Sequence, residues 1–314
     1  MRVLFFGTSG FALPTLEALL RAHEVVGVVT QPDRPAGRGQ KLLSSPVKLL
    51  AVDHKIPVLQ PEKVREPGWG ERLRALNAEV FVVAAFGQIL PKAVLDLPPR
   101  GSINVHASLL PKYRGAAPIA WALMNGESET GITTFLMDEG MDTGPILLQQ
   151  SVAILPEENA AVLSSRLARL GADLLLQTLK ELLAGRLRPK PQDHGRATLA
   201  PRLKKNDGFL DWRLPARMLV NRVRGRTPRP GAFTSWKQRR LDVLSGEALP
   251  AKGHEAPGTL AAHGSTVAIQ TGDGLFLPHE VQPESRHTMR WDDFLRGARA
   301  KPGDQLGGTL PEQV

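Results

Sequence analysis

The sequence contains no cysteine. This absence excludes a disulfide framework and any metal site built from thiolates. No apolar run reaches the roughly 20 residues that a membrane-spanning helix requires, and the opening apolar run at residues 3–6 indicates a buried first strand rather than a signal peptide. The Gly-x-Gly-x-x-Gly signature of dinucleotide sites is also absent. We therefore expect a cytoplasmic protein that holds no metal.

Positive charge is distributed unevenly along the chain. The 314 residues carry a formal charge of +9, with +3 over residues 1–200 and +6 over the shorter remainder. The positive charge is densest in residues 202–240, which contain twelve lysines and arginines and only two acidic residues, both aspartates. Such a concentration attracts phosphate backbones, although a solvated arginine-rich surface is the alternative interpretation. With 42% hydrophobic and 23% charged residues, the composition is typical of a soluble globular protein, and the length suits two domains.

The first half of the sequence predicts an α/β domain. Apolar runs without alternation at residues 3–6 and 25–29 indicate strands that are covered on both faces. Between them, Leu13, Leu16 and Leu19 form the apolar stripe of a helix. This βαβ opening predicts a Rossmann-like, doubly wound parallel sheet. Further strands are expected at residues 56–58, 80–86, 102–106, 131–137 and 146–154, and further helices at residues 72–76, 119–124 and 159–183.

A proline-rich stretch separates this half from a second domain. Residues 185–207 contain Pro189, Pro191 and Pro201 and show little apolar periodicity. A helix is expected at residues 216–223, followed by short strands at residues 232–236, 240–244, 258–260, 266–270 and 275–277. Short strands at this spacing favour a small OB-like β-barrel. We therefore expect a catalytic domain over residues 1–188, a linker over 189–207 and an OB-like domain over 208–314.

The alternating run at residues 102–106 carries two polar side chains on one face. Because residues two apart on a strand point the same way, Asn104 and His106 should lie side by side. Taken alone, such a pair often caps a turn or satisfies backbone groups. A second polar cluster downstream contains Asp142, which could reach His106 if the two segments are neighbours in one sheet.

The segments NVHASLLPKYRGAAPI and MDEGMDTGPIL together resemble the folate-dependent formyltransferases. The resemblance runs over about residues 1–295. It implies that Asn104, His106 and Asp142 form the catalytic trio and that the donor is 10-formyltetrahydrofolate. It also implies a folate site along two segments, lined by Ser108, Leu109, Leu110, Pro111, Phe86, Gln88, Ile89 and Leu90. The family usually has Gly-Thr-Pro near the first turn, whereas this chain has Gly-Thr-Ser, which leaves the role of that turn open.

The stretch QPDRPAGRG at residues 31–39 resembles the loop that methionyl-tRNA-specific members of that family insert toward the acceptor end of the tRNA. Its proline and glycine content predicts no regular structure before Val47. The resemblance implies that the acceptor is initiator methionyl-tRNA, bound by a protein that we expect to be a monomer. The basic residues that we expect to contact the tRNA are Arg34, Arg38, Lys41, Arg202, Lys204, Lys205, Arg222, Arg224 and Arg226.

Formyl transfer to an amine passes through a tetrahedral oxyanion, which fixed N–H donors stabilise. Asn104 and His106 could supply those donors, and Asp142 or a water on His106 could take the proton of the amine. The open alternatives are a formyltransferase for an amino-sugar nucleotide, a 10-formyltetrahydrofolate hydrolase and a non-catalytic RNA-binding protein. A serine hydrolase using Ser108 is disfavoured because no Gly-x-Ser-x-Gly elbow is present.

Overall fold

The computed structural model describes residues 1–36, 41–250 and 255–307. Contacts along the chain divide it into two compact units, which are described separately. Unit 1 consists of Met1–Pro118, Glu129–Ala153 and Ser164–Pro201, and unit 2 consists of Ile119–Ser128, Ile154–Leu163 and Arg202–Val314.

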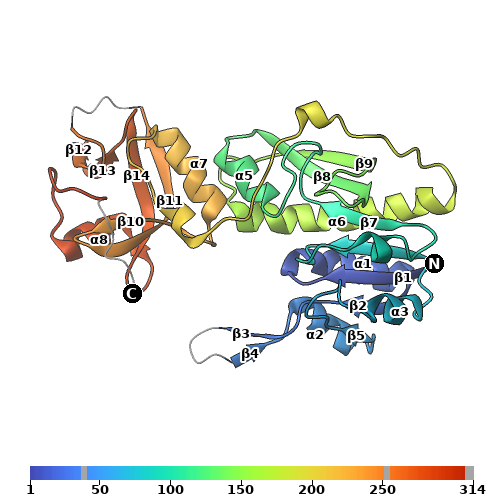
Figure 1. Ribbon diagram of the computed structural model, residues 1–314. Coiled ribbons are helices and arrows are strands. Elements are labelled where there is room, and N and C mark those ends of the chain that lie inside the picture. The colour runs from blue at the N-terminus through green and yellow to red at the C-terminus, as the bar shows by residue number, and fades with distance from the viewer. Residues whose placement is uncertain (37–40, 251–254, 308–314) are drawn as a thin grey trace. The chain divides into compact units, whose positions relative to one another are not determined.

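Unit 1 is built on a seven-stranded sheet with the order β5-β2-β1-β6-β7-β8-β9 (Figure 1). The strands from β5 to β7 are parallel, whereas β8 pairs antiparallel with β7 and β9 pairs antiparallel with β8. The predicted α/β class is confirmed, although the sheet is mostly rather than wholly parallel. The strands are β1 (Arg2–Gly7), β2 (Glu24–Val29), β5 (Val58–Leu59), β6 (Val80–Ala84), β7 (Ser102–His106), β8 (Glu129–Leu136) and β9 (Ile146–Ala153).

The central strands of this sheet are apolar because both of their faces are covered. β6 is buried at every position, and the side chains of Leu4, Phe6 and Phe81 form one core cluster with Leu73 of the neighbouring helix. Pro14 lies in the first turn of α1, where its missing N–H costs nothing. The helices that accompany the sheet are α1 (Leu13–Ala22), α2 (Pro46–Asp53), α3 (Trp69–Arg74), α4 (Lys92–Leu95) and α6 (Ala160–Leu183), the last of which starts in unit 2.

The basic loop after β2 contains regular structure that the sequence did not predict. β3 (Arg34–Ala36) and β4 (Lys41–Leu43) form a two-stranded antiparallel hairpin, and Figure 1 shows it extending away from the main sheet. The expectation of no regular structure before Val47 is therefore wrong. Backbone pairing between the two arms needs no periodic side-chain pattern, so the proline-rich sequence gave no sign of it.

Unit 2 contains a six-stranded antiparallel sheet, which confirms the predicted second domain of short strands. The strand order is β10-β11-β14-β13-β12, with β15 paired to β14. The strands are β10 (Ala232–Trp236), β11 (Arg239–Leu249), β12 (Leu260–His263), β13 (Thr266–Gln270), β14 (Leu275–Pro283) and β15 (Met289–Arg290). Two of these strands, β11 and β14, run several residues beyond their predicted ends. The helices of unit 2 are α5 (Pro118–Met124), α7 (Ala216–Arg226) and α8 (Trp291–Ala298).

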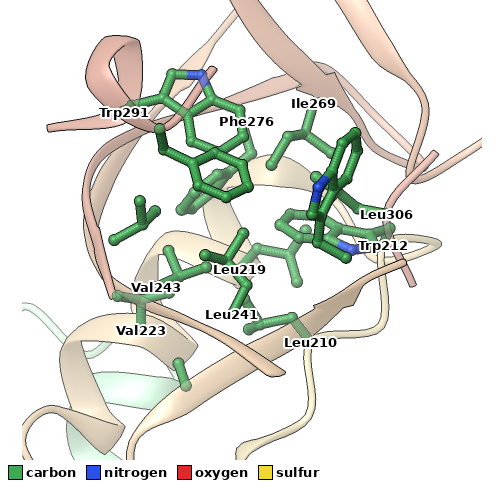
Figure 2. Close-up of a cluster of buried hydrophobic side chains, with 14 of the residues drawn as sticks. Leu210, Trp212, Leu219, Val223, Leu241, Val243, Ile269, Phe276, Trp291 and Leu306 are labelled. Carbon is green, nitrogen blue, oxygen red and sulfur yellow. The ribbon is translucent and has the colours of Figure 1, made fainter. Parts of the chain in front are cut away.

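One apolar cluster holds unit 2 together (Figure 2). Leu219 and Val223 of α7 face Leu241 and Val243 of β11, and Trp291 of α8 closes the other side. Helix α7 also passes α5 very closely, because a Cβ added to Gly225 would lie only 2.6 Å from the carbonyl oxygen of Ala120. A segment from the middle of the sequence is therefore part of the domain built by the C-terminal residues.

None of the helices in the described part of the chain is long and apolar enough to cross a membrane.

Candidate active site

Strand β7 brings Asn104 and His106 onto one face of the unit 1 sheet. Asn104 lies between Val83 of β6 and Phe135 of β8, and it is half-buried. His106, at the end of the strand, is only 6% exposed, and its ring meets that of Phe135 edge-on at 6.4 Å. The period-2 alternation of the strand accounts for this arrangement.

Both ring nitrogens of His106 face an oxygen. Nε2 lies 2.9 Å from the backbone oxygen of Tyr113, and because a carbonyl can only accept, Nε2 carries the hydrogen. Nδ1 lies 3.6 Å from Oδ2 of Asp142. The bond to Tyr113 thus fixes the orientation of the ring and leaves Nδ1 beside the carboxylate.

Asp142 lies on the loop between β8 and β9 in a backbone conformation that is unusual for a residue with a side chain. Its φ is 54°, in the left-handed region. Oδ2 accepts a 2.7 Å hydrogen bond from the backbone N–H of Gly115. The structure therefore brings together Asp142 and His106, as the sequence analysis anticipated from neighbouring segments.

The amide of Asn104 makes no hydrogen bond with any residue in the described ranges. Its donors and its acceptor remain available to a ligand on the face that it shares with His106. A half-buried amide with no partner is uncommon unless it serves a ligand or water.

A further pair, which sequence reasoning missed, lies beside Asp142. Arg114 is buried, and its guanidinium donates to Oε1 of Gln192 from Nη2 at 2.7 Å and from Nε at 3.1 Å. Gln192 in turn donates to the backbone oxygen of Asp142. No sequence pattern pointed to Gln192, because it lies in the proline-rich stretch assigned to a linker.

The loop from Ser108 to Pro111 is held tightly by its own domain. The Ser108 hydroxyl donates to the backbone oxygen of Lys112 at 2.6 Å. Thr133 donates to the Ser108 carbonyl and accepts from the Leu110 N–H, and Gln149 donates to the Leu110 carbonyl at 2.8 Å. These bonds occupy the carbonyls of Ser108 and Leu110 and the Leu110 N–H, and the apolar surface left for a ligand is that of half-buried Leu109 and Pro111.

The second predicted folate segment is only partly accessible. Phe86 and Leu90 belong to the core cluster, with 2% exposure each. The side chain of Gln88 bonds the backbone at Pro61, Glu62 and Val64. Ile89, by contrast, is 81% exposed.

A cavity of about 400 Å³ opens in unit 1 beside the loop that carries Asp142. Asp138 organises this loop, because its Oδ1 accepts from the Gly140 N–H at 3.1 Å and from the Thr143 hydroxyl at 2.6 Å. The cavity lies between α4 and the loop after β8, and its lining residues are Lys92, Leu95, Asp96, Met137, Asp138, Glu139 and Gly140. Within the described residues, no group of three metal-ligating side chains occurs.

The basic residues assigned to tRNA occupy very different environments. Arg202, Lys204 and Lys205 are exposed and Arg222 is half-buried. Arg34 is exposed and pairs with Glu62 at 2.7 Å. Arg38 lies outside the described residues, and the backbone of Lys41 begins β4.

Two of the arginines in this set point into unit 2. Arg224 donates to the backbone oxygens of Leu155 and Glu158. Arg226 is 7% exposed, and burial, together with neighbouring Arg222, lowers its pKa to about 10.

Comparison with known proteins places this site in a family. The family model described as "Formyl transferase" matches residues 1–179, and that described as "Formyl transferase, C-terminal domain" matches residues 202–299. The chain belongs to the formyl transferase family. It is 48% identical to a methionyl-tRNA formyltransferase of Citrifermentans bemidjiense over 98% of this chain and 96% of that protein. It is 49% identical to a methionyl-tRNA formyltransferase of Solibacter usitatus over 98% of this chain and 99% of that protein.

Solved structures share the fold at low sequence identity. The sugar 3N-formyl transferase WlaRD superposes with a TM-score of 0.66 at 17% identity, covering 91% of this chain and 99% of that one. HypX from Aquifex aeolicus, in complex with tetrahydrofolic acid, superposes with a TM-score of 0.65 at 16% identity, covering all of this chain and 50% of that one. These likenesses show the fold of the family and no more.

Proposed function

We propose that this protein transfers a formyl group from 10-formyltetrahydrofolate to the amino group of initiator methionyl-tRNA. The reaction belongs to the start of protein synthesis, so we expect it in the cytoplasm. One observation carries the choice of acceptor. Relatives that are about half identical over nearly the whole chain are methionyl-tRNA formyltransferases, whereas the sugar formyl transferase is 17% identical.

The geometry around His106 suits this chemistry. The amine nitrogen attacks the formyl carbon, and the new C–N bond forms as negative charge develops on the formyl oxygen. The free amide of Asn104 would donate to that oxygen. The amine must lose one proton, which Nδ1 of His106 or the carboxylate of Asp142 can accept. Collapse of the intermediate breaks the bond to the folate nitrogen, which takes up a proton.

We further propose that the cavity beside the Asp142 loop receives the pterin ring of the co-substrate. Its volume of about 400 Å³ falls within the range of about 300–1,000 Å³ typical of small-molecule sites. Leu95 and Met137 offer apolar surface to a flat ring, and the carboxylates of Asp138 and Glu139 can accept from ring N–H groups. Exposed Ile89 and the apolar side chains of residues 108–111 would then border the rest of the folate, so the donor lies next to His106.

The exposed cations are the proposed contacts with the tRNA. Arg202, Lys204 and Lys205 are free to approach phosphates, and Arg34 could exchange Glu62 for one. Arg222, Lys41 and Arg38 complete the proposed set. For Arg224 and Arg226 the same role would require them to leave their partners within unit 2. We retain residues 1–188 as the proposed catalytic domain, 189–207 as the linker and 208–314 as the tRNA-binding domain.

A labelled-formyl assay tests the function. The protein is incubated with 10-formyltetrahydrofolate labelled in the formyl group and, in parallel, with methionyl initiator tRNA, a dTDP-linked amino sugar, or no acceptor. We expect label on the α-amino group of methionine. Label on the sugar alone would support the amino-sugar alternative, and release of formate without an acceptor would support a hydrolase. The absence of turnover in every arm would support the alternative of a non-catalytic RNA-binding protein.

A further inference from the structure

Gln192 occupies a buried position in which every polar atom of its side chain is used. Oε1 accepts both bonds from Arg114, and Nε2 donates to the backbone oxygens of Asp142 at 2.9 Å and of Gly144 at 2.8 Å. Only one orientation of the amide satisfies these partners, because the guanidinium can only donate and the carbonyls can only accept. A saturated, buried amide of this kind specifies a single geometry.

The partners of Gln192 belong to the two segments that meet at His106. One is the loop of Asp142. The other is the turn after residue 112, in which Tyr113 accepts from His106 and the Gly115 N–H donates to Asp142. Gln192 therefore closes a ring of hydrogen bonds through Asp142, Gly115 and Arg114, and the imidazole is held beside this ring by Tyr113.

The chain around Gln192 is itself fixed to that turn. The Tyr113 N–H donates to the Thr198 hydroxyl at 2.8 Å, the Arg114 N–H donates to the Thr198 carbonyl at 2.9 Å, and the Ala200 N–H donates to the Arg114 carbonyl at 2.7 Å. The segment expected to be a linker thus contributes contacts within unit 1, as the division of the chain at Pro201 also indicates.

We propose that Gln192 is a positioning residue for formyl transfer, which holds Asp142 at its distance from His106. Asp142 needs such a restraint because its φ of 54° is a left-handed backbone conformation that residues with a side chain disfavour. The amide of Gln192 donates to the backbone oxygens of Asp142 and Gly144, while the N–H of Gly115 holds the Asp142 carboxylate. The kinetic test of this inference rests on the proposed function, whereas a second test, by NMR, is independent of it.

The kinetic test compares Gln192→Glu with the wild type. This variant keeps the size and the acceptor oxygens toward Arg114, but it loses both donors to the Asp142 loop. We expect kcat to fall by about 10- to 100-fold, the scale for a misplaced reacting group, while KM for the folate and for the tRNA changes by less than about threefold. The control is Gln270→Met in unit 2. Gln270 is also buried, and it donates to the Thr271 and Gly274 carbonyls, so this variant should be less stable while its kcat is unchanged.

A double-mutant cycle separates positioning from general damage. In an Asp142→Asn background, Gln192→Glu should lower kcat by less than about threefold, because its effect passes through Asp142. The same factor in both backgrounds would overturn the proposal, as would a wild-type kcat in the single variant. Gln192→Met, which makes none of the four bonds, should resemble Gln192→Glu in kcat if it remains folded by circular dichroism.

The second test needs no activity. In ¹⁵N NMR spectra of the wild type, the Nδ1 resonance of His106 reports the nearby carboxylate, and Gln192→Glu should move this resonance. Gln270→Met should leave it in place. An unmoved resonance would refute the positioning role, whereas failure of formyl transfer by the wild type would refute only the proposed function.

Discussion

The carboxylate of Asp142 is anchored by the backbone N–H of Gly115, at 2.7 Å. Gly115 can present this N–H because its φ is +118°, a conformation that glycine adopts far more readily than other residues. The segment around Ala200 also lies very close to Gly115. A Cβ added to Gly115 would be 2.8 Å from the carbonyl oxygen of Ala200. The proposed catalytic carboxylate thus depends on a residue that has no side chain.

Gly115→Ala should lower turnover strongly, by on the order of tenfold or more, because the turn must shift and its bond to Asp142 weakens. Gly70→Ala is the matched control, since its Cβ would meet nothing within 4 Å and it lies inside α3. The control should keep full activity and gain up to about 1 kcal/mol of stability. Steady-state kinetics and thermal melting measure both, and full activity of Gly115→Ala would show that the anchor is dispensable.

Asn104→Ala, His106→Asn and Asp142→Asn should each lower kcat by about a hundredfold or more, the usual scale for one oxyanion donor or acid–base group. Asn104→Ala should be the most stable of the three, because its amide has no partner among the described residues that would be left unsatisfied. Single-turnover formyl transfer with saturating substrates gives the measurement. A variant within threefold of the wild type would not belong to the mechanism.

Asp138→Ala should weaken tetrahydrofolate binding by about tenfold, since the loop that lines the 400 Å³ cavity loses two internal hydrogen bonds. Glu139→Ala, a change to a neighbouring lining residue that makes no such bonds, should weaken it less. Isothermal titration calorimetry with tetrahydrofolate compares the two. Equal affinities in all three proteins would place the pterin elsewhere.

Binding of initiator tRNA should weaken with salt, and the combined change Lys204→Gln and Lys205→Gln should reduce that dependence. Each lost phosphate contact lowers the slope of log K against log salt by about 0.7 to 0.9. Arg226→Met should leave the slope unchanged, because this buried side chain is not available to a phosphate while it stays in place. Fluorescence titrations at several salt concentrations decide between these outcomes, and a reduced slope in Arg226→Met would reveal that unit 2 rearranges on binding.

The base of the β3–β4 hairpin should loosen at acid pH. Asp33 accepts from Lys48, Gln60 and Ser44, and the bond from Lys48 is the main reason that its pKa lies below the usual 3.8. Because the folded form binds the proton less readily, the stabilisation is complete above about pH 3.8 and is lost as the pH falls through the lower folded pKa. Amide exchange of Leu43 at several pH values measures the loosening, which Asp33→Asn should produce already at neutral pH.

Local patterns predicted the strand face that presents Asn104 and His106, because strand periodicity depends only on neighbouring residues. They did not predict the ring of bonds through Gln192, in which backbone carbonyls from distant segments converge. Nor did they predict the antiparallel direction of β8 and β9, since strand direction depends on chain connections rather than composition. Helix α8 was missed although Trp291, Phe294 and Leu295 repeat at helical spacing, with two exposed aspartates between Trp291 and Phe294 in the first turn.

The close approach of Gly225 to Ala120 has a consequence for the order of folding during synthesis. The chain passes between the two units five times, and α5 emerges from the ribosome long before α7 is made. At about 5–20 residues per second, the interval is on the order of 5 to 20 seconds. During that time the face of α5 that packs against α7 has no native partner. Translation speed over the part of the message between α5 and α7 therefore sets how long this face is open to chaperones or to misassembly.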